Sequence, residues 1–414
     1  MEVIYERCAG LDVHKKSVTA CRITPAEGRG WQKEKRRFGT MTDELLQLAD
    51  WLRAGQVKAV AMESTGVYWK PVFNILESEF EVILVNARHI KYVPGRKSDV
   101  SDAQWIGELL QHGLLKASYI PERPQRDLRD LIRYRTALIQ ERTREINRVQ
   151  KVLEDANVKL ASVATNVMGV SGREMLAAII AGKDDPQALA DLAKGRLRAK
   201  IPQLERALQG RVRDSHRMLL QLHLEHIDEL SRKVERLNEE IEQQMRPFDE
   251  DEQLRRLDEI PGVGRDVAQV ILAELGNDMS RFPSSAHAAS WAGLTPGKNE
   301  SAGKNRSGKI TPGNKHLKVA LVQAAHAVGR TKGNYLAAQF RRLAARRGKK
   351  RAAIAVAHSI LIIAYHMLRD GTEYRDLGGD YFEKRNKVQL QRHLVKRLEG
   401  LGLQVSLQPA AVVA

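Results

Sequence analysis

Residues 8–23, CAGLDVHKKSVTACRI, decide how the first part of the chain folds. Apolar side chains fill the run 8–13, and apolar and polar side chains alternate over 17–23, which is the pattern of two neighbouring β-strands. A single carboxylate, Asp12, lies inside the first apolar run. Because a buried carboxylate without a partner is costly, Asp12 is the first candidate for a functional residue.

Strands and helices alternate from this pair of strands onward. We predict a short strand near 36–38, a helix over 42–53, a strand over 57–62 that ends on Glu63, a helix around 69–79, a strand over 82–85 and a helix over 99–111. Three strands followed by helix, strand, helix, strand and helix is the order of the ribonuclease H-like fold, an α/β layer sandwich. We assign this domain to residues 1–125.

The next region, 126–255, has the pattern of long charged helices. In the second of them the apolar residues are spaced alternately by three and four, at Ile227, Leu230, Val234, Leu237 and Ile241. This spacing predicts a coiled-coil hairpin of two helices, or an oligomer seam. The alternative is a pair of long surface helices within one domain.

A mainly helical domain is expected over 256–370, followed by a partly disordered tail over 371–414. The domain begins with LDEIPGVG, residues 257–264, in which Gly262 and Gly264 lie in a tight turn between two apolar-faced helices. This is the pattern of a helix-hairpin-helix, in which backbone N–H groups at a helix start hold a nucleic-acid phosphate. A glycine-rich turn that only reverses the chain has the same pattern.

Positive charge is concentrated in this last part of the chain. The formal net charge is +17, and residues 256–414 alone hold 26 basic and 12 acidic side chains. Between Met279 and Arg369 there are seventeen Lys and Arg residues but one carboxylate, Glu300, directly before Ser301. A soluble protein of high pI would not need such a concentration, so the pattern indicates a nucleic-acid partner.

One basic cluster stands out within this domain. Its members are Arg346, Arg347, Lys349, Lys350 and Arg351. We expect the cluster to bind a phosphate backbone, although a solvated charge run has the same composition.

Four acidic residues fall where the predicted α/β domain would gather them, namely Asp12, Glu63, Asp99 and Asp102. Converging carboxylates repel one another, so the arrangement requires divalent cations. Two Mg²⁺ ions would clamp the attacking and leaving oxygens of a phosphodiester. Asp99 and Asp102 have a second explanation, as helix-start residues favoured by the helix dipole. His14 either assists proton transfer or has a structural role.

The remaining composition argues against several classes of protein. Cys8 and Cys21 lie in predicted strands with no second pair for a zinc site, so reduced core thiols are expected. Neither a secretion signal nor a long apolar run is evident, so we expect a cytoplasmic protein that does not bind a membrane. An actin-like ATPase also has an aspartate on its first strand, but it needs glycine-rich phosphate loops that this sequence lacks.

Motifs in both halves together resemble a known family. GLDVHKK at 10–16, ESTGVY at 63–68 and RKSDVSD at 96–102 are similar to the DEDD transposases of insertion sequences, the insertion sequence one-ten family. The N-terminal domain of that family is similar to the RuvC junction resolvase. IPGVG at 260–264 and WAGLTP at 291–296, with ESAGK after them, look like its C-terminal transposase domain. The resemblance covers about residues 1–370.

The resemblance implies a recombinase that acts on donor and target DNA under the direction of a structured bridge RNA. It implies that the four carboxylates hold the metal and that Ser301 is the nucleophile of a covalent phosphoserine. Nearby cations that would stabilise the attacked phosphate are Lys304, Arg306 and Lys309. Glu300 would either accept the serine proton or position the loop. Some members have glycine directly after the serine, where this chain has Ala302.

Other interpretations stay open at this point. Without the resemblance, Ser301 is a turn residue in a glycine-rich loop, and Ser307 is its main competitor as nucleophile. The chain could instead be a metal-dependent, structure-selective nuclease in which water attacks, or a non-catalytic nucleic-acid-binding protein. If the long helices form an oligomer seam, we expect a homo-oligomer, either a dimer or a tetramer.

Overall fold

The computed structural model describes residues 2–64, 66–86, 90, 101–250, 252–297, 300–301, 304–305, 309–385 and 387–407. For residues 250, 300, 301, 304, 305, 389 and 390 it describes the backbone alone. Internal contacts divide the chain into two compact units, Met1–Pro121 and Glu122–Ala414. Each unit is described by itself below.

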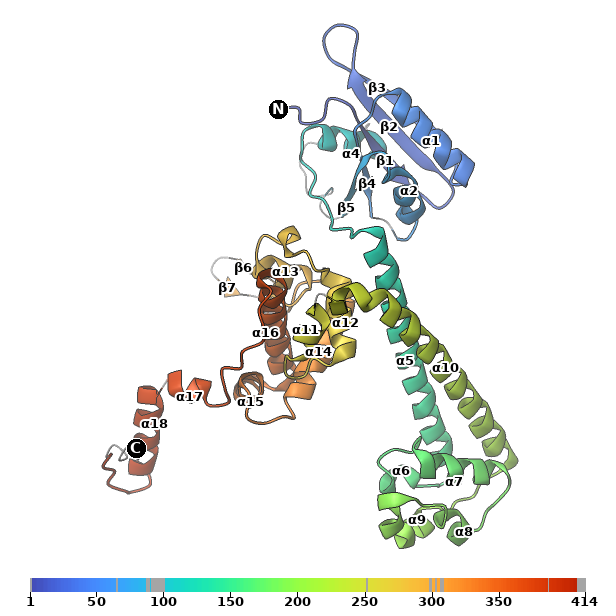
Figure 1. The fold of residues 1–414 in the computed structure, drawn as a ribbon, viewed down its shortest axis with the longest axis vertical. Helices are drawn as coiled ribbons and strands as arrows, with labels where there is room; N and C mark the ends of the chain where they lie inside the picture. Colours follow the sequence, from blue (N-terminus) through green and yellow to red (C-terminus); the bar gives the residue numbers. More distant parts are fainter. Residues whose placement is uncertain are drawn as a thin grey trace. The chain divides into compact units, whose positions relative to one another are not determined.

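The first unit is a five-stranded sheet with helices on both faces (Figure 1). Its strands are β1 (Cys8–Val13), β2 (Val18–Pro25), β3 (Trp31–Phe38), β4 (Ala59–Glu63) and β5 (Glu81–Val85), in the order β3-β2-β1-β4-β5. β2 is antiparallel to both β1 and β3, whereas β4 is parallel to β1 and to β5. The predicted order of elements is confirmed, and this mixed sheet is consistent with a ribonuclease H-like domain.

Two element boundaries differ from the prediction. β3 begins at Trp31, five residues before the predicted strand, because its polar sequence WQKEKRRF belongs to an exposed edge strand without apolar alternation. The last helix of the unit, α4 (Asp102–Gln111), begins at Asp102 because Ser101 has extended backbone angles. The predicted start of this helix, at Asp99, is therefore wrong. Asp99 itself lies outside the described residues.

The two faces of the sheet bury different helices. Ala9, Leu11 and Val13 pack in a core with α1 (Thr42–Ala54) and α2 (Trp69–Leu76), whereas Cys8 and Cys21 face α4. A Cβ atom on Gly10 would lie 2.2 Å from the carbonyl oxygen of Ala103, so only glycine allows α4 to lie directly on β1. Burial raises the pKa of the Cys8 thiol to about 12 and that of Cys21 to about 11. Both cysteines are free and buried, as predicted.

The second unit begins with two long helices, α5 (Arg123–Asp155) and α10 (Asp214–Glu250), which lie side by side (Figure 1). Leu138, Leu230 and Val234 are buried between them. The connection between the helices is made of α6 (Leu160–Val163), α7 (Val170–Ile180), α8 (Pro186–Ala190), the 3₁₀-helix η1 (Gly195–Lys200) and α9 (Ile201–Ala207). The two helices thus pair within one chain, and a coiled-coil supertwist or an oligomer seam remains a prediction.

The rest of the second unit is mainly helical. Its helices are α11 (Gln253–Asp258), α12 (Arg265–Leu275), η2 (Met279–Arg281), α13 (Ser285–Trp291), α14 (Lys315–Val328), α15 (Tyr335–Arg347) and α16 (Lys349–Asp370). α16 is long and apolar enough to cross a membrane by length and composition, but half of that apolar window is buried. It packs against α13, α14 and α15, which is the environment of a core helix. The predicted disordered tail contains two further helices, α17 (Tyr381–Arg385) and α18 (Lys387–Glu399), in its described part.

The two glycines of the predicted helix-hairpin-helix turn have different environments. Gly262 has a φ of +85°, and a Cβ atom there would lie 2.5 Å from the carbonyl oxygen of Ala324 in α14. Gly264 is the exposed N-cap residue of α12, with open space around its Cβ position. The turn therefore packs α12 against α14 through Gly262. Phosphate binding at Gly262 and Gly264 remains a prediction.

A matched pair of substitutions tests this difference. We expect Gly262→Ser to lower the free energy of unfolding by about 1–3 kcal/mol, because the new side chain adds backbone strain and a clash with α14. Gly264→Ser places a good N-cap residue in open space, so it should leave stability unchanged or slightly raised. Chemical denaturation of both variants measures the two effects. Equal stability of the two variants would contradict the packing role of Gly262.

Candidate active site

Asp12 and Glu63 lie on neighbouring strands, at the end of the sheet where β1 and β4 terminate. β1 and β4 are parallel, and their register pairs Leu11 with Met62. The next residues in each strand are Asp12 and Glu63, at the carboxyl ends of strands about 4.8 Å apart. Gly10 and Ala61 face α4, so alternation places both carboxylates on that same face.

Asp102 lies at the start of α4, over the same face of the sheet. The carbonyl of Ala103 meets Gly10 of β1, and Cys8 Sγ lies 3.7 Å from the carbonyl oxygen of Gly107. α4 therefore runs antiparallel to β1, and its first turn is at the Asp12 end of the strand. Three of the four predicted carboxylates thus share one face and one end of the sheet.

His14 contacts the first of these carboxylates. Its Nε2 atom lies 3.1 Å from Asp12 Oδ2, and its side chain is 66% exposed. Such exposure does not fit a buried structural histidine. His14 instead borders the carboxylates from the β1–β2 turn.

The carboxylate oxygens of these residues are suitable ligands for a hard divalent cation. The described part of the chain does not, however, bring enough of them together to form a complete site. Carboxylate oxygens are the ligands that Mg²⁺ prefers. Within the described residues, no three His, Cys, Asp or Glu side chains lie close enough to hold a metal ion. The Ser101 hydroxyl, beside Asp102, is buried without a hydrogen-bond partner among those residues. The metal site therefore remains a proposal.

Ser301 lies in a β-hairpin of the second unit. β6 (Glu300–Ser301) pairs with β7 (Lys304–Asn305), and Ser301 is opposite Lys304. The base of the hairpin is held by a bridge between Pro296 and Ile310, and by the Gly297 N–H, which donates to the carbonyl of Lys309 at 2.8 Å. Ser301 is thus in a strand of a hairpin. The predicted residues Arg306 and Ser307 lie outside the described residues, as does Ala302.

A buried carboxylate anchors the segment that follows the hairpin. Glu274 of α12 is 1% exposed, and Arg133 of α5 donates to both of its oxygens at 2.7 Å. Asn314, the N-cap residue of α14, donates to Glu274 at 2.6 Å and accepts from the first turn of α14. Burial alone would raise the pKa of Glu274, but Arg133 and Arg129 outweigh it and hold the pKa below its usual range. This network, which we did not predict, fixes α5, α12 and α14 together.

Breaking the network should destabilise the second unit. Glu274→Gln leaves two arginines beside α12 without their countercharge, so we expect a loss of about 3 kcal/mol in the free energy of unfolding. The folded pKa of Glu274 is lowered, so its contribution is present above the unfolded pKa of about 4.3 and is lost as pH falls through the folded pKa. The free energy of unfolding of the variant should therefore fall less between neutral and acid pH than that of the unmodified protein. Denaturant titrations at pH 7 and pH 4 measure both effects, with the exposed Glu235→Gln as the control.

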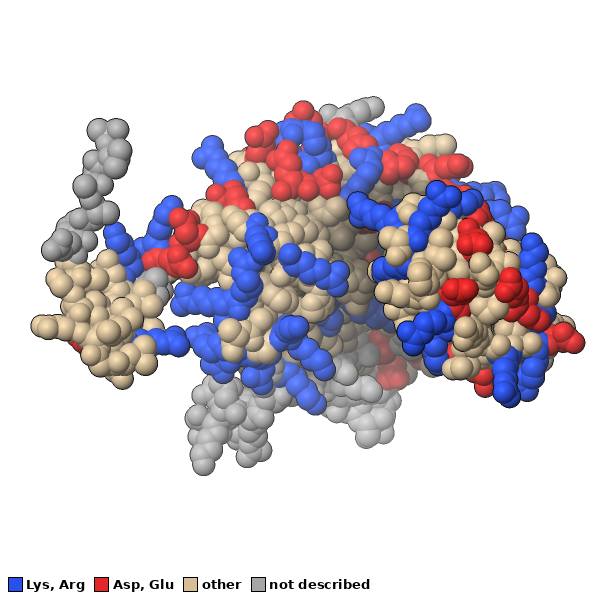
Figure 2. All heavy atoms as spheres, turned by 90° about the horizontal axis from the view of Figure 1, so that it is seen from below, with Lys and Arg blue, Asp and Glu red and all other residues tan. Residues whose placement is uncertain are grey.

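The basic cluster is exposed. Arg346 and Arg347 end α15, Gly348 turns the chain, and Lys349, Lys350 and Arg351 open α16. None of the five cations forms an ion pair with the part of the chain that the structure describes. Figure 2 shows Lys and Arg side chains gathered over the C-terminal helices on the face in view. Cations at a helix N-terminus are disfavoured by the helix dipole, so the start of α16 does not itself stabilise them, and binding of the cluster to a phosphate backbone remains a prediction.

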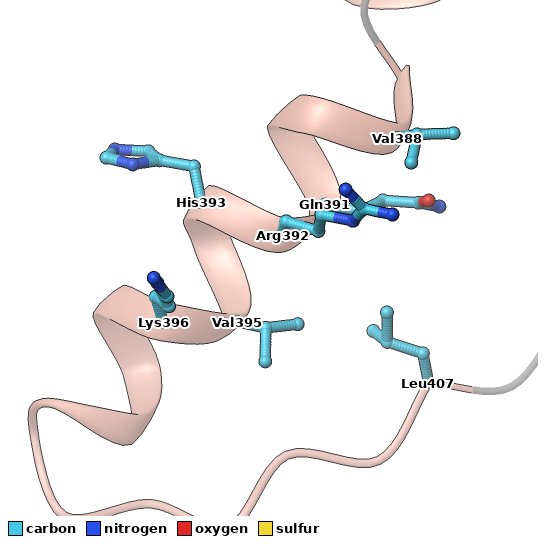
Figure 3. Close-up of a pocket in the computed structure, with 7 residues that line it drawn as sticks. All are labelled: Val388, Gln391, Arg392, His393, Val395, Lys396 and Leu407. Atoms are coloured by element: carbon cyan, nitrogen blue, oxygen red, sulfur yellow. The ribbon is translucent and has the colours of Figure 1, made fainter.

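An open hollow lies elsewhere, between α18 and Leu407 (Figure 3). Its lining combines the apolar side chains of Val388, Val395 and Leu407 with polar ones, namely Gln391, Arg392, His393 and Lys396. Its lining contains no carboxylate and no predicted site residue. The hollow is therefore separate from the candidate active site.

Two family models match this chain in the order of its two units. A model described as transposase, DEDD_Tnp_IS110, matches residues 9–158, and one described as transposase of the IS116/IS110/IS902 family matches residues 254–341. Together they span more than half of the chain.

Curated relatives agree with these models. A probable family 20 transposase of Pseudomonas aeruginosa is 26% identical over 80% of this chain and 89% of its own length. The transposase for insertion sequence element IS1111A of Coxiella burnetii is 25% identical over 77% of this chain and 80% of its own length. An IS110 protein of Streptomyces coelicolor is 35% identical over 28% of this chain and 29% of its own length. The chain is therefore a DNA transposase, and it belongs to the IS110 family of insertion-sequence transposases.

Proposed function

We propose that this transposase cuts and rejoins DNA strands with a metal-binding carboxylate site and a serine nucleophile. Asp12, Glu63, Asp99 and Asp102 would hold two Mg²⁺ ions, and Ser301 attacks the phosphodiester. The observation that carries the carboxylate site is the placement of Asp12 beside Glu63, with α4 opening at Asp102 over the same face. Bound Mg²⁺ would supply charge neutralisation and polarise the phosphodiester.

Ser301 performs the covalent step in this proposal. Its Oγ forms a bond to phosphorus, the bond from phosphorus to one sugar oxygen breaks, and that oxygen leaves as a hydroxyl after taking up a proton. The serine proton passes to a nearby base, for which Glu300 is the adjacent candidate. Attack by a sugar hydroxyl on the phosphoserine reverses the step and joins a new pair of strands. No external energy source is needed, because the phosphoserine conserves the phosphodiester bond energy.

The basic charge of the second unit supports nucleic-acid partners. Donor and target DNA and a guide RNA bind the basic helical domain, and further copies of the chain assemble through the long helices α5 and α10. A purified recombination assay tests this function: the chain is mixed with Mg²⁺, donor and target DNA, and RNA transcribed from the non-coding DNA beside its reading frame. Joined products that require the RNA support the proposal. Products that form equally without RNA contradict guidance while leaving transposition intact.

Neutralising the basic cluster should weaken DNA binding without regard to sequence. Changing its five cations to glutamine removes charges that face phosphates, so the slope of log affinity against log salt should flatten by about 0.9 for each phosphate that is no longer neutralised. Fluorescence anisotropy with duplex DNA at several salt concentrations measures this slope. Arg369→Gln with Lys384→Gln is the control, since both cations are exposed but already paired, with Asp370 and Asp380. An unchanged slope would mean that the cluster faces solvent in the complex.

A further inference from the structure

Positive charge is also concentrated within the first unit. Residues 1–125 are nearly balanced, with 18 basic and 16 acidic side chains, yet Lys15–Arg37 holds eight basic and two acidic ones. Four of the eight lie on the edge strand β3, at Lys33, Lys35, Arg36 and Arg37. Among the described strands β3 pairs with β2 alone, so these cations lie on an edge strand with one free side.

The register of the sheet sorts these cations onto two faces. Lys35 is opposite Cys21, which faces α4, and Arg37 is opposite Thr19 in the same alternation. Lys33 shares that face, since its Nζ atom donates to Glu108 of α4 at 2.7 Å. Arg36 is on the other face, with its guanidinium 5.0 Å from the ring centre of Phe38. Lys35 and Arg37 therefore lie on the face that carries the carboxylates.

Arg37 lies in the same row of the sheet as the carboxylates. Asp12 is opposite Thr19, and Thr19 is opposite Arg37. Glu63, Asp12, Thr19 and Arg37 thus form one row across four neighbouring strands. With strands about 4.8 Å apart, the backbone of Arg37 is about 10 Å from that of Asp12.

One of these two cations has a local contact within the unit. The Arg37 guanidinium donates to the hydroxyl of Ser17 at 3.0 Å, in the β1–β2 turn. Lys15 and Lys16 are exposed in that same turn. Lys35 has no ion pair among the residues described. Lys33 is different, because Glu108 already neutralises it.

We propose that Lys35 and Arg37 bind the sugar-phosphate backbone of the DNA strand that is cut, and hold it along the row that leads to Asp12 and Glu63. This inference rests on the proposed function, because it assigns a DNA-positioning role to residues beside the proposed metal site. Charge complementarity selects the ligand: two cations without a carboxylate partner on an exposed strand match a polyanion. Charged residues on an edge strand also prevent sheet-to-sheet aggregation, but that role is served equally by cations on either face.

The two faces of β3 provide a matched test in the full-length protein. K35Q/R37Q removes the cations on the carboxylate face, and R36Q removes a cation from the same strand on the opposite face. For a single-stranded DNA oligonucleotide, K35Q/R37Q should flatten the salt slope by about 1.4, which corresponds to two phosphates, while R36Q leaves it unchanged. Strand cleavage by K35Q/R37Q should fall at least tenfold, and R36Q should stay within twofold of the unmodified protein.

Three results would overturn the inference. Equal slopes for all three proteins would show that this face does not bind DNA, and equal aggregation of both variants would show that the charges only protect the edge. If K35Q/R37Q flattens the salt slope for RNA but not for DNA, this surface binds the guide RNA instead. D12N separates this inference from the proposed function, because it should keep the DNA slope and lose cleavage. If D12N cleaves normally while K35Q/R37Q flattens the slope, the DNA surface stands and the proposed carboxylate chemistry fails.

Discussion

Ser301→Ala is expected to abolish strand cleavage and strand exchange, by about 10³-fold or more, while the complex with DNA and RNA still assembles. The side chain loses only its hydroxyl, so the strand pairing of Ser301 with Lys304 is kept. Loss of the hydroxyl removes the atom that forms the phosphoserine, and no covalent intermediate can then conserve the phosphodiester energy. Cleavage and rejoining should therefore disappear together.

Ser307→Ala is the matched control, since it removes a hydroxyl from the same basic segment. It should change recombination far less. The measurement uses Mg²⁺, RNA and a nicked DNA substrate that traps the intermediate, followed by a denaturing gel and mass spectrometry of the adduct. An adduct mapped to Ser307 would show that Ser307, and not Ser301, is the nucleophile. Free cut ends without any adduct, produced equally by Ser301→Ala, would favour hydrolysis by water and thus a nuclease.

The sheet could be predicted because its central strands have strong local signals. β1 and β4 are short apolar runs, so both their presence and the positions of Asp12 and Glu63 at their ends are evident from the pattern alone. β3 has no such signal, because an edge strand with exposed charged side chains has no apolar alternation. Its face assignments depend on the register with β2, which is set by long-range pairing.

The helical unit shows where prediction from sequence stops. Glu274 interrupts the apolar helix sequence VILAEL, and a carboxylate in such a position was a detectable sign of a buried partner. The partners, Arg133 and Asn314, are 141 and 40 residues away in the chain, and no spacing rule connects them. Gly262 shows the same limit: its Cβ position meets α14, which the motif did not predict, and the phosphate contact that the motif predicted remains a prediction. Local patterns name candidates, and tertiary contacts decide between structural and functional roles.

Asp12→Asn and Asp102→Asn should each lower recombination by about 10²–10³-fold while DNA binding and stability change little. Each substitution keeps the volume of the side chain and removes one charge from the proposed metal site. Weakened affinity for the ion should be measurable without activity, as a reduced stabilisation of the folded protein by added Mg²⁺ in thermal unfolding. Recombination that persists in EDTA would contradict the metal site.

Asp43 separates the metal role of Asp102 from its helix-start role. Asp43 occupies the first turn of α1, as Asp102 occupies the first turn of α4, and both side chains are exposed. If Asp102 only stabilises the helix start through the helix dipole, then Asp102→Asn and Asp43→Asn should each lower the free energy of unfolding by about 0.3–1 kcal/mol. Both variants should then recombine DNA as well as the unmodified protein does. If Asp102 binds the metal, only its substitution removes recombination and the response to Mg²⁺. The comparison is informative because the two aspartates share helix position and exposure, and only Asp102 lies over the face where Asp12 and Glu63 meet.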